Sequence, residues 1–146
     1  MYRRQIEAIL SVDNITKKTF RGVFPMDRLP ASRQLGGYVI NLDDHDEPGS
    51  HWVAVYDDGK EVEYMDSYGT PPLDLLCLQF VGPNYAYNTI PLQQRLSNAC
   101  GFYCVYYIFQ RARGFSAEHI LKTLRRSDSG YVVKNFLYSR FRPMLK

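Results

Sequence analysis

The sequence predicts an α+β fold in which one central, buried helix packs on a mostly antiparallel sheet. Residues 52–66 contain two strand-like runs joined by a short polar turn, which is the pattern of a β-hairpin. Residues 100–112 are apolar on nearly every face, contain no proline and have a glycine only in the first turn. Such a segment is typical of a helix buried on all sides.

The length and composition indicate one folded unit. The chain has 146 residues, of which 45% are hydrophobic and 23% charged. These values are ordinary for a globular protein and exclude a disordered chain. We find no internal repeat and no linker, so we expect a single domain over residues 1–146.

The N-terminal part is predicted to start with a helix over residues 2–11, because its apolar residues recur on one side. A short helical turn is expected to begin at Asp13. Residues 20–33 are predicted to be an irregular connection, since one glycine and two prolines interrupt their periodicity.

The sheet begins with a predicted strand over residues 38–42, followed by an acidic loop over 43–49. Residues 52–56 show too little alternation for a strand exposed on one face, so we expect a central strand there. Residues 61–66 alternate as a half-buried antiparallel partner, joined through a turn at 57–60. The later elements are predicted as helical turns over 73–80, a strand over 85–90, the buried helix over 100–112, and helices over 116–126 and 131–141 with basic outer faces.

Targeting and redox signals favour an intracellular protein. No apolar run approaches the roughly 18 residues that a membrane helix needs. The first ten residues carry charges where a signal peptide would be apolar, so we expect no membrane association. The three cysteines lack the spacing of a disulfide framework, and we expect free thiols in a reducing compartment.

Cys100 stands where an irregular polar segment gives way to the buried helix. Unpaired N–H groups and the helix dipole stabilise a thiolate at such a position and lower its pKa. The sequence therefore makes Cys100 a candidate nucleophile. The alternative is that Cys100 is a small buried core residue.

His51 precedes the predicted central strand, and Asp66 ends the neighbouring strand of the hairpin. The start of one strand lies beside the end of its antiparallel partner, so we expect the two side chains to touch. Asp66 would accept the Nδ1 proton of His51 and orient the ring as a general base toward Cys100. The alternative for Asp66 is a cap of the turn at residues 66–69.

Attack of a thiolate on an amide needs donors for the developing oxyanion. The Cys100 backbone N–H supplies one. Gln93 and Gln94 both qualify as a second, and Gln94, six residues before the cysteine, is preferred. The groove for the substrate is predicted at Gly49, Trp52 and Gly101, where Gly101 permits close approach of a peptide backbone. No metal site is expected, because Cys100, Cys104 and a distant histidine lack zinc-ligand spacing.

The segment Gln93 to Cys104, the motif Gly49-Ser50-His51-Trp52 and the motif Tyr64-Met65-Asp66-Ser67 together resemble the adenovirus protease and the ubiquitin-like-protein protease superfamily. The order His, Asp, Gln, Cys is that of the superfamily and differs from papain-like enzymes, which are only distantly similar. Ala99 and the Cys-Gly-x-x-Cys spacing resemble the viral branch, including virus-like transposons. Asp66 departs from the glutamate of the adenovirus enzyme. No cysteine between residues 81 and 99 offers the attachment point of its peptide cofactor.

The resemblance implies a cysteine endopeptidase that cleaves after small residues of the Gly-Gly or Gly-Ala type and matures viral capsid or core precursors. Two alternatives stay open: an isopeptidase that removes ubiquitin or SUMO-like modifiers, and a catalytically inactive module that binds DNA or protein. The implied partners are protein substrates, and we expect a monomer located in the host nucleus or the virion.

The net charge of +3 hides a strong segregation of charge along the chain. Residues 43–75 hold ten acids and one base, whereas residues 111–146 hold nine bases and two acids. The chemistry requires no cofactor, but the viral resemblance raises DNA as an activator or track. A solvated helix face is the alternative explanation of the basic run. The candidate DNA-binding residues are Lys122, Arg125, Arg126, Lys134, Arg140 and Arg142.

Overall fold

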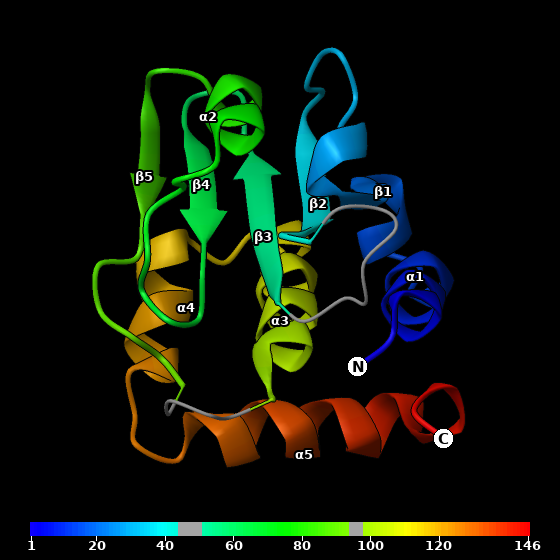
Figure 1. The fold of residues 1–146 in the computed structure, drawn as a ribbon. Coiled ribbons are helices and arrows are strands. Elements are labelled where there is room, and N and C mark those ends of the chain that lie inside the picture. The colour runs from blue at the N-terminus through cyan, green and yellow to red at the C-terminus, as the bar shows by residue number, and fades with distance from the viewer. Residues whose placement is uncertain (44–50, 94–97) are drawn as a thin grey trace.

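The computed structural model describes residues 1–43, 51–93 and 98–146 (Figure 1). Five strands form one sheet, and helices cover both of its faces. The strands are β1 (Phe20–Pro25), β2 (Gly36–Asn41), β3 (Trp52–Asp57), β4 (Val62–Met65) and β5 (Tyr85–Tyr87). The α-helices are α1 (Arg3–Val12), α2 (Leu75–Val81), α3 (Cys100–Ala112), α4 (Ala117–Leu124) and α5 (Ser129–Phe141), with 3₁₀ turns η1 (Thr16–Lys18), η2 (Met26–Arg28) and η3 (Arg142–Met144).

The strands follow one another in space in the order β1-β2-β3-β4-β5. The three inner strands pair in antiparallel fashion, and the edge strands β1 and β5 each pair in parallel with their neighbour. The predicted hairpin is present as β3 and β4, with Ala54 opposite Met65. The predicted α+β class and the central place of residues 52–56 are thereby confirmed.

The sheet separates two apolar clusters because successive side chains of a strand point to opposite faces. Trp52, Ala54 and Tyr56 of β3 pack with α3, around which α1, α4 and α5 are arranged. Val53 and Val55 face the other way, toward α2. The predicted buried helix is confirmed, since every residue of α3 from Cys100 to Phe109 is buried. No helix in the described parts of the chain is long and apolar enough to cross a membrane.

The prediction of an irregular connection over residues 20–33 is wrong in its first half, which forms the edge strand β1. Gly22 has φ +136° and lies where the register with β2 shifts by a residue. A bulge at glycine and a proline are tolerated at a sheet edge, where one side of the strand needs no partner. Local breaks in periodicity therefore concealed a real strand.

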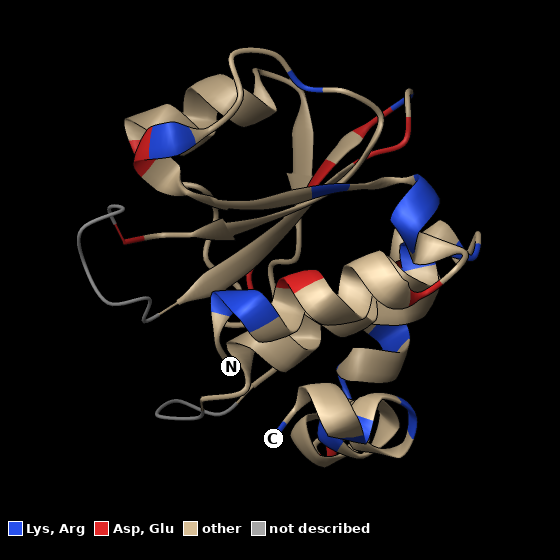
Figure 2. Ribbon diagram, turned by 90° about the vertical axis from the view of Figure 1, so that its right-hand side faces the viewer, with Lys and Arg blue, Asp and Glu red and all other residues tan. Residues whose placement is uncertain are grey.

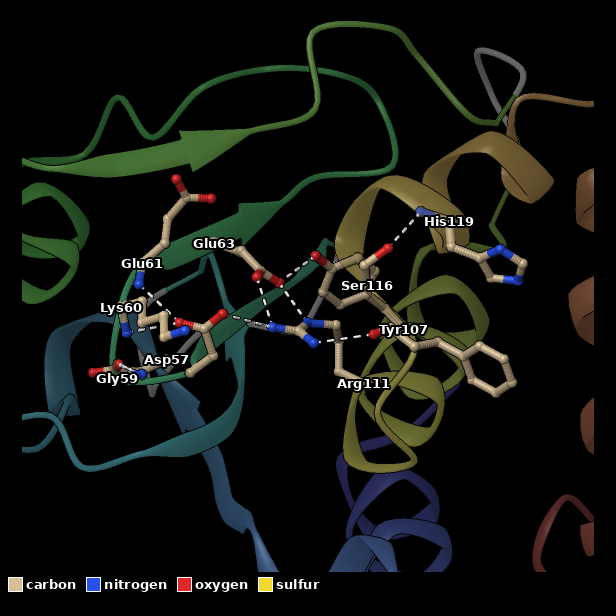
Figure 3. A network of polar contacts seen from close by, with 11 residues as sticks. Asp57, Gly59, Lys60, Glu61, Glu63, Tyr107, Arg111, Ser116 and His119 are labelled. Atoms are coloured by element: carbon tan, nitrogen blue, oxygen red, sulfur yellow. Dashed lines mark hydrogen bonds and ion pairs between the residues drawn. The ribbon is translucent and has the colours of Figure 1, made fainter.

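A buried ionic network fastens the C-terminal half of α3 to β4 (Figure 3). Glu63 is almost fully buried, although the alternating pattern predicted a half-buried strand. Arg111 donates from Nε to one carboxylate oxygen and from an Nη to the other, both at 2.9 Å. The Tyr107 hydroxyl donates to the same carboxylate at 2.6 Å, and Arg111 also bonds Asp58 in the hairpin turn. The contacts satisfy a carboxylate that is costly to bury alone.

Candidate active site

Cys100 is the first residue of α3, at the end of the helix that faces the start of β3. Its side chain is buried, with 6% of the residue exposed. Burial raises the pKa of the thiol, but His51 and the backbone N–H groups of Trp52 and Gly101 outweigh it, so the pKa lies below its ordinary value. The N-terminal end of the helix thus holds a thiol that ionises readily.

His51 directly precedes β3, and its carbonyl accepts a hydrogen bond from the N–H of Leu42, the residue after β2. Its Nε2 lies 2.9 Å from Oδ1 of Asp66. Burial lowers the pKa of the imidazole, but its interactions with Asp66 and Cys100 raise it to about 9. The opposite shifts of His51 and Cys100 favour transfer of the thiol proton to the ring.

The ring is turned opposite to the sequence-based expectation, which assigned Nδ1 to Asp66. Asp66 lies across the strand pair, and the far nitrogen Nε2 reaches it. Nδ1 is buried and has no hydrogen-bond partner among the described residues. Nδ1 is therefore the nitrogen that remains for the thiol of Cys100.

Asp66 follows the last residue of β4 and is 3% exposed. Its Oδ1 accepts the backbone N–H of Tyr68 at 2.8 Å as well as the contact from His51. Its carbonyl accepts from Gly69 at 2.8 Å, which closes the turn. The two readings of Asp66, orienting group and turn cap, hold together, because one carboxylate oxygen does both.

Sequence reasoning missed two residues around this pair. The ring of Tyr68 lies 4.8 Å from the His51 ring between centroids, at 33°, and covers one face of the imidazole. The side chain of Asn88, just beyond β5, bonds both the N–H and the carbonyl of Asp66. The Asp-Ser-Tyr-Gly turn motif could have suggested Tyr68, but no local signal indicated Asn88.

Of the two candidate oxyanion donors, only Gln93 lies among the described residues. Gln94 lies outside them, as does Gly49 of the predicted substrate groove. Gln93 is buried, and its Oε1 accepts the Ser67 hydroxyl at 2.5 Å. The N–H groups of Leu92 and Gln93 donate to the Ser67 carbonyl at 2.7 and 3.1 Å. The segment that leads to the second oxyanion candidate is therefore tied to the residue that follows Asp66.

The same segment is anchored from its other side. The hydroxyl oxygens of Tyr103 in α3 and Ser129 in α5 each lie 2.9 Å from the Leu92 carbonyl oxygen, which accepts a hydrogen bond there. These hydroxyls also lie 2.6 Å from each other, and all three groups are buried. Residues 92 and 93 are thus held against the helix that starts at Cys100.

The two described residues of the predicted substrate groove contact the N-terminal residue. The Trp52 indole N–H donates to the Met1 carbonyl at 3.1 Å. A Cβ at Gly101 would lie 2.9 Å from the Met1 Cβ and 3.4 Å from Trp52. Glycine is therefore required here by the packing of Met1 and Trp52, while the role of Gly101 toward a substrate stays a prediction.

Lys122 lies on α4, Arg125 and Arg126 in the turn between α4 and α5, Lys134 and Arg140 on α5, and Arg142 on η3, in the C-terminal part of the fold (Figure 2). Lys122 and Arg125 are exposed. Arg126 pairs with Asp128 at 3.1 Å. Three of the cations lie over aromatic rings. Lys134 lies over Phe102 of α3, Arg140 over Phe136 of α5, and Arg142 over Tyr138 of α5.

Cys104, one helical turn after Cys100, is buried, and burial raises the pKa of its thiol well above the ordinary value. Cys77 behaves in the same way, with its pKa raised to about 12. All three cysteines are free thiols. Within the described segments no group of three or more His, Cys, Asp or Glu side chains is arranged to hold a metal ion.

Comparison with known sequences identifies viral cysteine proteases. The chain is 26% identical over 117 residues to Cysteine protease S273R of African swine fever virus, isolate Tick/Malawi/Lil 20-1/1983. It is equally similar to SUMO-1 cysteine protease S273R of the isolate Pig/Kenya/KEN-50/1950. Both alignments cover 70% of this chain but 43% of the relative, so the chain spans less than half of the relatives it matches. No protein-family model matches the sequence.

Comparison with solved structures shows the same fold. A crystal structure of the African swine fever virus protease pS273R superposes with a TM-score of 0.57 at 21% identity. The match covers 88% of this chain and 63% of that one. The protease-like arrangement of helix and sheet expected from the sequence is confirmed.

Proposed function

We propose that the chain is a cysteine protease of the adenovirus-protease-like and ubiquitin-like-protein protease superfamily, because it is similar in sequence to the viral S273R cysteine proteases and shares their fold. Cys100 is the nucleophile, His51 the general base and Asp66 the residue that orients His51. The observation that carries the proposal is the contact of Nε2 of His51 with Asp66 at 2.9 Å, beside a thiol whose pKa the same imidazole lowers.

Hydrolysis would pass through a thioester. Cys100 gives its proton to His51, and the thiolate adds to the carbonyl carbon of the scissile bond. The backbone N–H of Cys100 and one glutamine stabilise the oxyanion. His51 then protonates the leaving nitrogen as the C–N bond breaks. Water, deprotonated by His51, attacks the thioester and releases the acid and the thiol.

Replacement of Cys100 tests the proposal. We expect Cys100→Ala and Cys100→Ser to lose peptide cleavage while unfolding at nearly the same denaturant concentration as the wild type. Cys104→Ser is the matched control, because it alters a thiol one turn away that has no part in the chemistry. Retained turnover in Cys100→Ala would refute the assignment. If the Cys100 thiol does not react with an electrophilic probe that carries a Gly-Gly sequence, the alternative of an inactive binding module is favoured instead.

The substrate class is proposed from the motifs that resemble the viral proteases. We propose cleavage after small residues, of the Gly-Gly or Gly-Ala type, in viral capsid or core precursors, by a monomer inside the infected cell, in the nucleus or virion. The name SUMO-1 cysteine protease, carried by one relative, favours a second candidate, removal of a ubiquitin-like modifier. Parallel incubation with precursor-derived peptides and with SUMO conjugates separates the two, since each predicts preferential turnover of its own substrate.

The second oxyanion donor is proposed to be Gln94. The buried Gln93 amide already accepts a hydrogen bond from Ser67, which gives it a structural contact in the turn after Asp66. We expect Gln94→Ala to lower kcat by about a hundredfold with KM little changed. Gln93→Ala is expected to act mainly on stability. The reverse result would assign the donor to Gln93.

A further inference from the structure

Asp66 stands at the place where the backbone pairing of the sheet stops. The last β4–β5 pair is Tyr64 with Tyr87, and the last β3–β4 pair is Ala54 with Met65. The chain that carries the orienting carboxylate has thus already left the strand ladder. Something other than a neighbouring strand must hold its peptide groups.

The carboxamide of Asn88 takes the place of that neighbour. Its Oδ1 accepts the Asp66 N–H at 3.0 Å, and its Nδ2 donates to the Asp66 carbonyl at 2.5 Å. A planar amide presents an acceptor and a donor side by side, as a strand backbone does. The side chain therefore continues the β4–β5 pairing by one residue beyond Tyr87.

Both partners are buried, with 4% of Asn88 and 3% of Asp66 exposed. A buried N–H or carbonyl without a partner is costly, so the pairing strongly favours one position of the Asp66 backbone. Nδ2 also donates to the Ile90 carbonyl at 3.4 Å, which ties the amide to its own turn. The Asn88 amide is thus held both by Asp66 and by its own turn. We call this pair of hydrogen bonds to the Asp66 backbone the Asn88 clamp.

We propose that Asn88 is a positioning residue of the active site, which sets the Asp66 carboxylate against His51 through two hydrogen bonds to the Asp66 backbone. The inference rests on the proposed function, since it makes Asn88 a support of the catalytic residues Cys100, His51 and Asp66. A displacement of a catalytic group by about 1 Å is enough to lower the reaction rate strongly. Asn88 itself is not placed in contact with the thiol or the imidazole.

The pKa of Cys100 depends on how His51 and Asp66 are placed, and it can be measured without a peptide substrate. Asp66 and Cys100 are the ionisable groups that raise the pKa of His51. Tyr64 and Cys104, which also lie in the electrostatic surroundings of Asp66, have pKa values that burial raises and stay neutral near pH 7. Tyr68 covers the ring. The pH midpoint of Cys100 alkylation by iodoacetamide therefore follows the placement of Asp66.

The experiment compares the wild type, Asn88→Ala, Asn88→Ser and Tyr107→Phe, each confirmed as folded by circular dichroism. We expect the midpoint in Asn88→Ala to rise by about one pH unit, so that alkylation at a pH well below the wild-type midpoint slows about tenfold. Asn88→Ser, whose hydroxyl can bond only one of the two Asp66 groups, is expected to lie between. Tyr107→Phe removes a buried hydrogen bond from the opposite part of α3 and should leave the midpoint unchanged.

The outcomes separate this inference from the proposed function. A wild-type midpoint near that of a free thiol overturns the thiolate and imidazolium pair itself. A low wild-type midpoint that Asn88→Ala shares overturns the role of Asn88 alone. Should Asn88→Ala not fold, Asn88→Ser decides by the same criterion. An equal shift in Tyr107→Phe would make the effect one of general destabilisation and overturn the inference.

Discussion

At the scale of single residues, His51 couples two groups that cannot be understood separately. Asp66 and Cys100 raise its pKa to about 9, and His51 in turn lowers that of Cys100. The titration belongs to the pair, so two apparent values describe it. Between them the thiolate and the imidazolium coexist, which is the state that cleavage requires.

The first expected consequence is a bell-shaped pH profile of kcat/KM. Activity should rise with pH through the lowered pKa of Cys100, because the thiolate forms there. It should fall as pH passes about 9, because His51 then loses the proton that the leaving amine needs. Peptide cleavage measured from pH 5 to 10 checks both limbs. A rate that only begins to rise near the ordinary thiol value of 9.0 would contradict the pairing.

The second concerns the orienting carboxylate. Asp66→Asn keeps the size of the side chain but removes the charge that supports the imidazolium. We expect kcat to fall by about a hundredfold or more, and the upper pKa of the pH profile to move downward. Asp128→Asn, which loses an exposed carboxylate paired with Arg126, is the control and should be silent. Unchanged kcat in Asp66→Asn would show that the turn is the whole role of this residue.

At the scale of elements, α3 connects the site to a distant anchor. The helix begins at Cys100, and its other half holds Tyr107 and Arg111 against Glu63 of β4. The sheet places His51 and Asp66, and the helix places the thiol, so their contact depends on how α3 lies on β3 and β4. The buried network holds the C-terminal half of the helix, whereas the N-terminal half, next to the chemistry, is held separately by the Tyr103 hydroxyl at the Leu92 carbonyl.

The network provides the third expectation. Arg111→Met leaves the Glu63 carboxylate buried without its main partner, and we expect it to lower the free energy of unfolding by about 3–5 kcal/mol. Tyr107→Phe should cost less, roughly 1.5–3 kcal/mol. Urea unfolding measures both.

The double variant Glu63→Leu with Arg111→Met is the control, because it removes both charges together. It should recover much of the loss of Arg111→Met. An Arg111→Met variant as stable as the wild type would show that the ion pair contributes nothing net.

At the scale of the whole molecule, charge is divided between regions. Nine of the 18 Lys and Arg residues fall within residues 111–146, whereas residues 43–75 hold ten acids and one base. Figure 2 shows further basic positions on other elements of the fold. Lys134, Arg140 and Arg142 lie over aromatic rings. All six candidate cations are exposed except Lys134, which is half-buried. We propose DNA as a partner of the surface that these residues form, on the ground of the viral resemblance.

The fourth expectation is a salt-dependent affinity for duplex DNA. If these cations contact phosphates, log Kd rises linearly with log salt. Replacement of Lys122 and Arg125 by Glu should weaken binding and flatten the slope by about two. Arg3→Glu, on the N-terminal helix, is the control. Binding that is indifferent to salt between 50 and 200 mM would exclude a phosphate contact.

Local patterns were sufficient for the elements whose signal is periodic. The spacing of apolar residues indicates whether a segment is buried on one face or on all faces. This spacing predicts the helix that starts at Cys100, the central strand after His51 and the hairpin that ends at Asp66. The meeting of His51 with Asp66 followed from hairpin geometry alone. These features depend on contacts between neighbours in the chain or across one short turn.

Tertiary contacts alone settled the features that no periodicity encodes. The edge strand β1 exists because β2 pairs with it despite Gly22 and Pro25. The choice of Nε2 for Asp66 depends on how two strands approach, and the clamp of Asn88 on Asp66 joins residues 22 positions apart. Hydrogen bonds between residues so far apart leave no repeating pattern in a sequence, because their geometry is set by how the whole sheet packs around them.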